Sequence, residues 1–186
     1  DVQFDWPKGF PNSPGDVKNF LIGAEILSVK RRAKVLIINL DSKYSLVIHL
    51  KMTGQLVYRS NESKTRYGAG HPNDSLIGKL PDKSTRVTIG FKDSKLFFND
   101  QRKFGWMRLL PTIEVPNIDF FKKVGPEPLE DAFKFPQFKI RLLKRKNSNI
   151  KSVILDQTVI AGVGNIYADE SLFAEKIHPK TIVGDI

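Results

Sequence analysis

Arg102, Lys103 and Phe104 stand together in the stretch "NDQRKFGWMRLL", just before Gly105 at a predicted β-turn. Arginine offers a forked hydrogen-bond donor and phenylalanine offers a flat ring. This pair suits a loop that enters DNA, because Phe104 can wedge a base step while Arg102 binds the base left unpaired. The alternative interpretation is a core phenylalanine flanked by surface charges.

A second candidate is the stretch "SVKRRAKVLIINL", in which Lys30, Arg31, Arg32 and Lys34 crowd the entry to a predicted strand. Mutual repulsion among these cations indicates an anionic partner. Lys34 adjoins the apolar run, where partial burial lowers a lysine pKa and fits the amine for proton transfer or phosphate contact. The alternative is a strand-edge lysine that discourages aggregation.

The third candidate is "IHLKMTGQL", where His49 and Met52 approach a tight turn at Gly54. An exposed methionine at a turn can act as an apolar wedge between bases. The alternative is that Met52 fills a gap in the core, as methionines commonly do.

The stretch "QTVIAGVGNIYADESLF" places glycines between an apolar segment and a new helix. A dinucleotide-binding fingerprint needs a third glycine where Tyr167 stands, and the preceding segment has helical rather than strand spacing. We therefore expect two helices joined by a glycine turn, with Asn165 as N-cap and Asp169 and Glu170 in the first turn. Such a helix start binds phosphate through its free N–H groups.

Composition favours a polyanionic partner, the alternative being a merely soluble basic protein. The 186 residues include 30 Lys and Arg against 20 Asp and Glu, which gives a net charge of +10. The absence of cysteine excludes disulfides and cysteine-ligated zinc within this chain, and the three histidines are too dispersed to predict a metal site. No apolar stretch is long enough for a membrane span and no targeting signal is seen, so we expect a cytoplasmic protein that meets DNA inside the cell.

The predicted strands are short, polar–apolar alternating segments separated by turn residues. They are "AEILSV", "KVLIINL", "YSLVIHL", "GQLVYR", "RVTIGF", "KLFFND" and "WMRLL". Their close spacing favours antiparallel hairpins in a β-sandwich over about residues 25–110. The polar, glycine-containing segment 60–84 is predicted to be one long mobile loop.

Prolines and a glycine in "KKVGPEPLEDAF", residues 122–133, predict the joint between two parts. Helical spacing follows, with a basic cluster that contacts phosphate or forms a solvated helix face: Lys139, Arg141, Lys144, Arg145, Lys146 and Lys151. The predicted fold class is α+β. An antiparallel β-sandwich domain at 1–121, incomplete at its start, precedes a helical domain at 122–186, incomplete at its end.

Five motifs, "RRAK", "HLKMTG", "DQRKFGW", "GPEPL" and "IAGVGNIYADESLFAEKIHP", stand in an order and spacing that resemble the formamidopyrimidine-DNA glycosylase family, which includes the endonuclease VIII type. The resemblance covers about residues 25–180, and the last motif resembles the family's helix-two-turn-helix element. It implies a monomeric DNA glycosylase with AP-lyase activity that flips damaged nucleotides out of duplex DNA. The Arg-Lys-Phe sequence resembles the branch that excises 8-oxoguanine and formamidopyrimidines.

The resemblance also implies residue roles. The void left by the flipped nucleotide would be filled by Met52, Arg102 and Phe104. Lys34 would serve phosphate contact and catalysis. The residues expected to face the DNA backbone are His49, Lys103, Lys151, Gly164 and Asn165. Those expected near the flipped nucleotide are Tyr167 and Glu170.

The family's nucleophile is implied to be an N-terminal proline followed by glutamate, whose amine attacks C1′ of the damaged nucleoside. This chain begins Asp1-Val2 and reaches its first proline at Pro7. We therefore expect a central fragment of a glycosylase, inactive by itself, that lacks the C-terminal zinc finger of the family and holds no cofactor. The alternative is a non-catalytic module that binds damaged DNA after losing the proline. A third interpretation, a helix-two-turn-helix of the ribosomal or topoisomerase kind, is disfavoured by "RRAK" and "DQRKFGW".

Overall fold

The computed structural model describes residues 1–62 and 65–186. The chain divides into two compact units. Unit 1 comprises Asp1–Arg31 and Val35–Val115, and unit 2 comprises Pro116–Ile186 together with Arg32–Lys34. The predicted boundary between residues 121 and 122 falls within a short helix, α2 (Asp119–Lys123).

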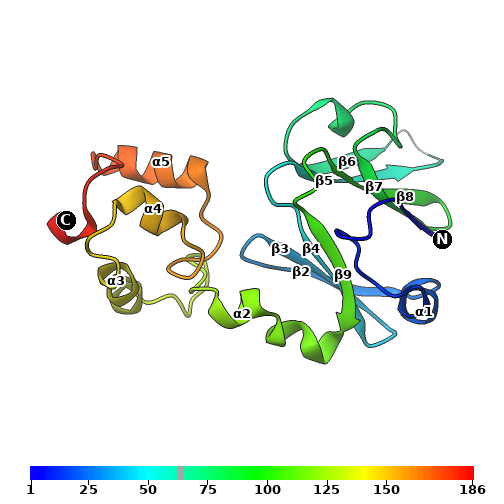
Figure 1. Ribbon diagram of the computed structural model, residues 1–186, viewed down its shortest axis with the longest axis horizontal. Coiled ribbons are helices and arrows are strands. Elements are labelled where there is room, and N and C mark those ends of the chain that lie inside the picture. Colours follow the sequence, from blue (N-terminus) through cyan, green and yellow to red (C-terminus); the bar gives the residue numbers. More distant parts are fainter. Residues whose placement is uncertain (63–64) are drawn as a thin grey trace. The chain divides into compact units, whose positions relative to one another are not determined.

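Unit 1 contains two sheets (Figure 1). The five-stranded sheet has the order β1-β7-β8-β5-β6, built from Val2–Phe4, Thr85–Gly90, Ser94–Asp100, Gly54–Ser60 and Arg66–Gly70. The four-stranded sheet has the order β2-β3-β4-β9, built from Ile26–Arg32, Val35–Leu40, Tyr44–His49 and Trp106–Pro111. Neighbouring strands run antiparallel, for example Ile48 opposite Met107 and Leu56 opposite Phe98. All seven predicted strands are confirmed.

The core of unit 1 lies between the two sheets. Ile48 and Met107 from the four-stranded sheet and Phe98 from the other are at most 1% exposed and belong to one apolar cluster. On β9, the buried residues Met107 and Leu109 alternate with the exposed Arg108, so one face of this strand lies in the core, as a sandwich requires. The short helix α1 (Pro14–Asp16) leads into the π-helix η1 (Val17–Leu21), which adds Val17 and Leu21 to this core. The α+β prediction with an antiparallel sandwich is confirmed.

The prediction of one long loop at 60–84 is wrong for the part that the structure describes; residues 63 and 64 lie outside it. Residues 66–70 form β6, which pairs with β5, and Asp74–Leu76 form a 3-10 turn, η2. The Arg66 guanidinium donates to the carbonyls of Gly78 and Ser75, each at 2.6 Å. The sequence "RYGAG" has low strand propensity, but ladder hydrogen bonds to β5 outweigh it.

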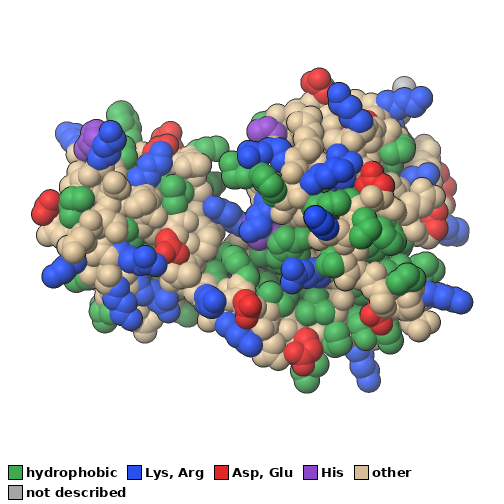
Figure 2. Space-filling view, viewed as in Figure 1, with side chains coloured by type: hydrophobic (Ala, Val, Ile, Leu, Met, Phe, Trp, Pro, Cys, Tyr) green, Lys and Arg blue, Asp and Glu red, His purple; other side chains and the backbone are tan. Residues whose placement is uncertain are grey.

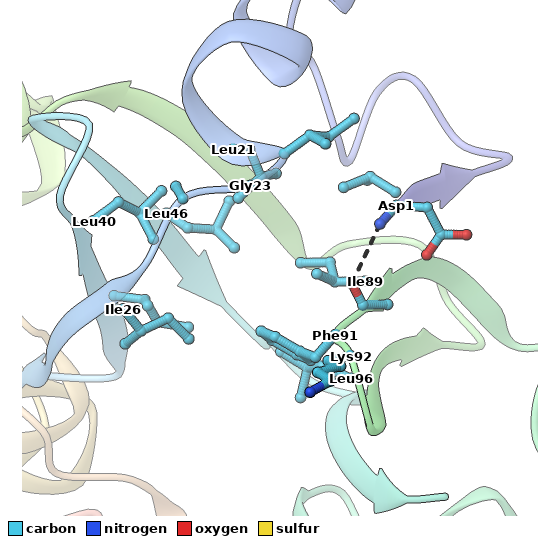
Figure 3. Close-up of a pocket in the computed structure, with 15 residues that line it drawn as sticks. Asp1, Leu21, Gly23, Ile26, Leu40, Leu46, Ile89, Phe91, Lys92 and Leu96 are labelled. Carbon is cyan, nitrogen blue, oxygen red and sulfur yellow. Dashed lines mark hydrogen bonds between the residues drawn. The ribbon is translucent and has the colours of Figure 1, made fainter.

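An apolar pocket of about 440 Å³ opens between the sheets (Figure 3). Leu40 and Leu46 line it from one sheet and Ile89 and Leu96 from the other. The ammonium group of Asp1 donates to the Gly90 carbonyl at its rim, at 3.3 Å. None of the predicted site residues lines this pocket.

Unit 2 is helical (Figure 1). Its helices after α2 are α3 (Phe135–Leu143), α4 (Ile150–Leu155), α5 (Asn165–Ala174) and the 3-10 turn η4 (Val183–Asp185). A further 3-10 helix, η3 (Thr112–Asn117), spans the division between the units. The core of unit 2 is formed by Ile150, Val153, Val159, Leu172 and Val183. The predicted helical part is confirmed, and among the described residues no helix is long and apolar enough to cross a membrane.

Candidate nucleic-acid interface

Two neighbouring turns of unit 1 carry the predicted wedge residues. Residues 101–105, called here the wedge loop, join β8 to β9, and residues 50–53, the Met52 turn, join β4 to β5. Met52 is 62% exposed and Phe104 is 55% exposed. The Arg102 guanidinium lies over the Phe104 ring, 4.9 Å from its centroid. These exposures exclude the alternatives in which Met52 and Phe104 fill the core.

A buried carboxylate holds both turns. Asp100 is 1% exposed and accepts hydrogen bonds from the backbone N–H of Gly105 at 2.7 Å and of Arg102 at 3.1 Å. It also accepts one from the Thr53 hydroxyl, which ties the wedge loop to the Met52 turn. The backbone that carries the predicted wedge residues is thus held by hydrogen bonds. Asp100 was not predicted from the sequence, although an Asp that bonds the backbone two residues on is a known turn signal.

Backbone geometry shapes the wedge loop further. Lys103 adopts a φ of +59°, and a Cβ at Gly105 would lie 2.8 Å from the Phe98 ring, so glycine alone fits there.

His49 is 8% exposed, and its Nδ1 accepts a hydrogen bond from the Lys51 N–H at 2.9 Å. The imidazole therefore supports the backbone of the Met52 turn.

In unit 2, Lys34 contacts the glycine turn that precedes α5. Its Nζ donates to the Val163 carbonyl at 2.7 Å. Gln157 Nε2 donates to the same carbonyl at 2.9 Å, and the Gly162 N–H donates to Gln157 Oε1 at 2.9 Å. A Cβ at Gly164 would lie 3.3 Å from Lys34 Nζ. Desolvation by burial lowers the pKa of Lys34. The structure therefore brings Lys34 beside Gly164, next to Asn165 in sequence.

Glu127, from the "GPEPL" motif, holds the segment that carries Lys34. It is 4% exposed, and its carboxylate accepts a hydrogen bond from the Ala33 N–H and pairs with Arg32 at 3.3 Å. Arg32 also donates to the Gly125 carbonyl at 2.9 Å. Ala33 has a φ of +52°, a conformation that these contacts stabilise. The role of Glu127 was missed, because nothing in its sequence context indicates that it is buried.

The start of α5 differs from the prediction by one residue. Gly164 is the N-cap and Asn165 is the first helical residue, so the assignment of Asn165 as N-cap is wrong. Gly164 has no side chain to cap the helix, and no side-chain cap hydrogen bond is present. Asp169 and Glu170 lie beyond the first turn, which contains no acidic residue, so that expectation is also wrong.

The remaining predicted residues of unit 2 lie on or against α5. Tyr167 is 73% exposed, and Glu170 is exposed on the same helix. The Lys151 ammonium pairs with the Asp169 carboxylate at 2.7 Å, although both side chains remain partly exposed. A phosphate at Lys151 would therefore compete with a carboxylate.

Unit 1 thus carries His49, Met52, Arg102, Lys103 and Phe104, and unit 2 carries Lys34, Lys151, Gly164, Asn165, Tyr167 and Glu170. Lys and Arg side chains are spread over both units on the face drawn in Figure 2. Throughout residues 1–62 and 65–186, no group of three His, Cys, Asp or Glu side chains is arranged to hold a metal ion.

Comparisons with known proteins agree with this division of the chain. The model of the formamidopyrimidine-DNA glycosylase N-terminal domain matches residues 1–107, and that of the formamidopyrimidine-DNA glycosylase H2TH domain matches residues 124–186. The formamidopyrimidine-DNA glycosylase of Desulforamulus reducens is 41% identical over 158 residues, which are 84% of this chain and 50% of that protein. The chain spans about half the length of the curated relatives it matches.

Solved structures show the same similarity. The Lactococcus lactis formamidopyrimidine-DNA glycosylase, bound non-covalently to DNA containing an AP site, superposes with a TM-score of 0.81 at 30% identity. The match covers all of this chain and 65% of that one. A G226P variant of the same enzyme, bound to DNA containing Fapy-dG, gives the same TM-score and identity with 62% of its chain covered. The chain therefore belongs to the formamidopyrimidine-DNA glycosylase family.

Proposed function

We propose that the protein acts in DNA repair as a glycosylase with AP-lyase activity that excises oxidised purines, such as 8-oxoguanine and formamidopyrimidines, from duplex DNA. In this proposal it works as a monomer, and the residues of this chain supply the wedge and the phosphate contacts. A glycosidic bond inside a base stack is inaccessible, so the damaged nucleotide must first be flipped out.

The observation that carries this proposal is the fixed, exposed wedge. Phe104 and Met52 are large apolar side chains held outside the core on turns joined through Asp100. Two apolar side chains on linked turns, next to an arginine, have the form of a wedge that separates a base step. Arg102 beside them offers a bidentate donor for the base left unpaired.

The phosphate contacts are proposed at the start of α5. The uncapped N–H groups after Gly164 carry the positive end of the helix dipole, and the Lys34 ammonium lies against the same turn. Partial desolvation also lowers the pKa of Lys34, although the residue remains exposed and its ammonium can be reached by a phosphate. The nucleophilic attack on C1′ is assigned to none of the residues described.

The family similarity supports the substrate class. The related Lactococcus lactis enzyme is bound to Fapy-dG DNA in one structure and to AP-site DNA in another. The test uses the 186-residue chain and measures its affinity for a labelled duplex with one tetrahydrofuran abasic analogue, by fluorescence anisotropy. We expect tighter binding than to the undamaged duplex, and a loss of that preference in Arg102→Ala and Phe104→Ala.

Equal affinity of the native chain for both duplexes would contradict the proposal. Excision is tested separately on the natural protein from its own source, with an 8-oxoguanine duplex and borohydride trapping of a covalent adduct, because the 186-residue chain by itself is expected to be inactive. Strand cleavage with a trapped adduct supports the glycosylase and lyase steps. Lesion-selective binding without cleavage or adduct supports the second candidate, a module that recognises damaged DNA without cutting it.

A further inference from the structure

The segment 6–12 of unit 1 precedes the short helix α1. It runs along β9, an edge strand of the four-stranded sheet. The Met107 N–H donates to the Gly9 carbonyl at 2.7 Å, and the Leu109 N–H donates to the Asn12 side-chain oxygen at 2.7 Å. Asn12 returns a hydrogen bond to the Met107 carbonyl at 3.2 Å. The segment is therefore pinned to the strand that follows the wedge loop.

This pinning creates a groove of about 480 Å³ next to the wedge loop. We call it the Trp6–Trp106 groove; its lining is Trp6, Lys8, Lys103, Phe104, Gly105, Trp106 and Arg108. All seven residues belong to unit 1 and are described, and none is acidic. Three are aromatic and three are cationic, a combination typical of grooves that bind the unpaired bases and phosphates of single-stranded nucleic acid.

The arrangement of rings and cations follows from the extended backbone. Residues two apart in a strand share a face. On β9, Trp106 and Arg108 lie on the outer face, while Met107 and Leu109 are buried. The Arg108 guanidinium stacks on the Trp106 ring, 4.9 Å from a ring centroid. The pair thus offers a flat, positively charged surface.

Trp6 is held in place by Gly9. A Cβ at Gly9 would lie 1.8 Å from the Trp6 ring, so the indole packs directly on the glycine backbone. The backbone N–H groups of Gly9 and Phe10 both donate to the Trp6 carbonyl at 3.1 Å. Lys8 lies on the same tight turn and is exposed. The indole and the ammonium are therefore presented together beside Phe104.

We propose that the Trp6–Trp106 groove binds a nucleotide of the duplex that the wedge loop has unstacked, with its base on the indole and guanidinium surfaces and its phosphate on Lys8 and Lys103. This inference rests on the proposed function, because it needs DNA at the wedge loop. It adds Trp6, Lys8, Trp106 and Arg108 to the interface. The aromatic rings of the groove suit a base and its cationic side chains suit a phosphate, so the occupant that fits is a nucleotide.

The chain contains two tryptophans, and both line the groove. Intrinsic tryptophan fluorescence therefore reports from this site alone. In Trp106→Phe the emission comes from Trp6, and in Trp6→Phe it comes from Trp106. Each variant is titrated with the tetrahydrofuran duplex, and binding is measured in parallel by anisotropy of the labelled DNA.

We expect DNA to quench the emission of both single-tryptophan variants, with midpoints that match the anisotropy curves. Trp6→Leu should weaken binding about fivefold or more, since base–aromatic stacking is lost, while Trp6→Phe keeps most of the affinity. Lys8→Ala should reduce the slope of log K against log salt by about 0.9. Lys18→Ala, an exposed lysine of η1, is the matched control and should change neither quantity.

The groove proposal would be overturned if both single-tryptophan variants bound the tetrahydrofuran duplex with unchanged emission and Lys8→Ala bound it with native affinity. The proposed function would then remain intact. No binding of any duplex by the native chain would overturn both. Circular dichroism of each variant shows whether the fold is retained, and the ring-preserving Trp6→Phe variant keeps the proposal testable if Trp6→Leu unfolds.

Discussion

The Thr53 hydroxyl donates a hydrogen bond to the Asp100 carboxylate, across 47 residues of sequence. This contact joins the turn that exposes Met52 to the loop that exposes Arg102 and Phe104. Two loops that are separate in sequence are therefore linked by a hydrogen bond in unit 1. We expect this link to favour intercalation, because a side chain that is already in position loses less conformational freedom on binding.

Breaking the hydrogen bond between Thr53 and Asp100 should weaken binding of the lesion-containing duplex. Thr53→Val removes the hydroxyl while keeping the shape of the side chain, and leaves one oxygen of Asp100 with fewer donors. We expect the free energy of unfolding to fall by about 1–3 kcal/mol, and affinity for the tetrahydrofuran duplex to fall with it. Urea unfolding and anisotropy measure the two effects. Thr53→Ser restores the donor and should behave as the native chain; equal losses in both variants would count against the hydroxyl.

Glu127 should be necessary for the stability of unit 2. Glu127→Gln removes a buried charge that pairs with Arg32 and accepts from the Ala33 N–H. We expect a loss of about 1–3 kcal/mol in unfolding free energy. Glu130→Gln changes an exposed carboxylate three residues on and should stay within about 0.5 kcal/mol of the native value. Similar urea midpoints for the two variants would refute the anchoring role.

Lys34 should titrate below the ordinary lysine value of about 10.4. Desolvation lowers its pKa, so the neutral, reactive amine is present at lower pH than in an unperturbed lysine. The acetylation rate of each lysine is followed by mass spectrometry across a pH series. The pH at which the rate is half its maximum gives the pKa, because access of the reagent changes the maximal rate and not this midpoint. A Lys34 midpoint at or above the ordinary value would contradict the burial effect.

We expect Asp82 to make the free energy of unfolding of unit 1 depend on pH in the acidic range. Burial alone raises its pKa, but hydrogen bonds from Ser75 and Ser84 outweigh this, and the pKa is lowered. A carboxyl with a lowered pKa stabilises the fold above its unfolded value of about 3.9, and this contribution is lost as pH falls through the folded value. The stability difference between native chain and Asp82→Asn should therefore shrink from about pH 6 to about pH 3. Asp93→Asn, at an exposed site, is the control; a constant Asp82 difference would contradict the prediction.

The strands were predictable because alternation of apolar and polar residues reports directly on a two-layer sandwich. The segment 60–84 was not, because β6 exists through pairing with β5 and not through its own composition. Asn165 is a strong N-cap residue by type, yet the backbone places Gly164 at the cap, a difference of one residue that sequence preferences do not resolve.

The candidate site, like the fold, could be predicted from the sequence only in part. An exposed Phe104 was one of two alternatives that the sequence offered, because the residue follows Arg102 and Lys103 and precedes the turn glycine Gly105. The supports of the site were missed: Asp100 and Glu127 are charged residues that look like surface positions until tertiary contacts bury them. Trp6 lies far in sequence from the wedge loop, and the hydrogen bonds of Gly9 and Asn12 to β9 bring it there.

The most direct test of the wedge is a duplex that carries 2-aminopurine beside the tetrahydrofuran site. This base fluoresces weakly when stacked and strongly when unstacked. The native chain should raise its fluorescence on binding, whereas Phe104→Ala at saturating concentration should raise it far less, because the ring that separates the base step is gone. Equal increases with the native chain and with Phe104→Ala would contradict the account.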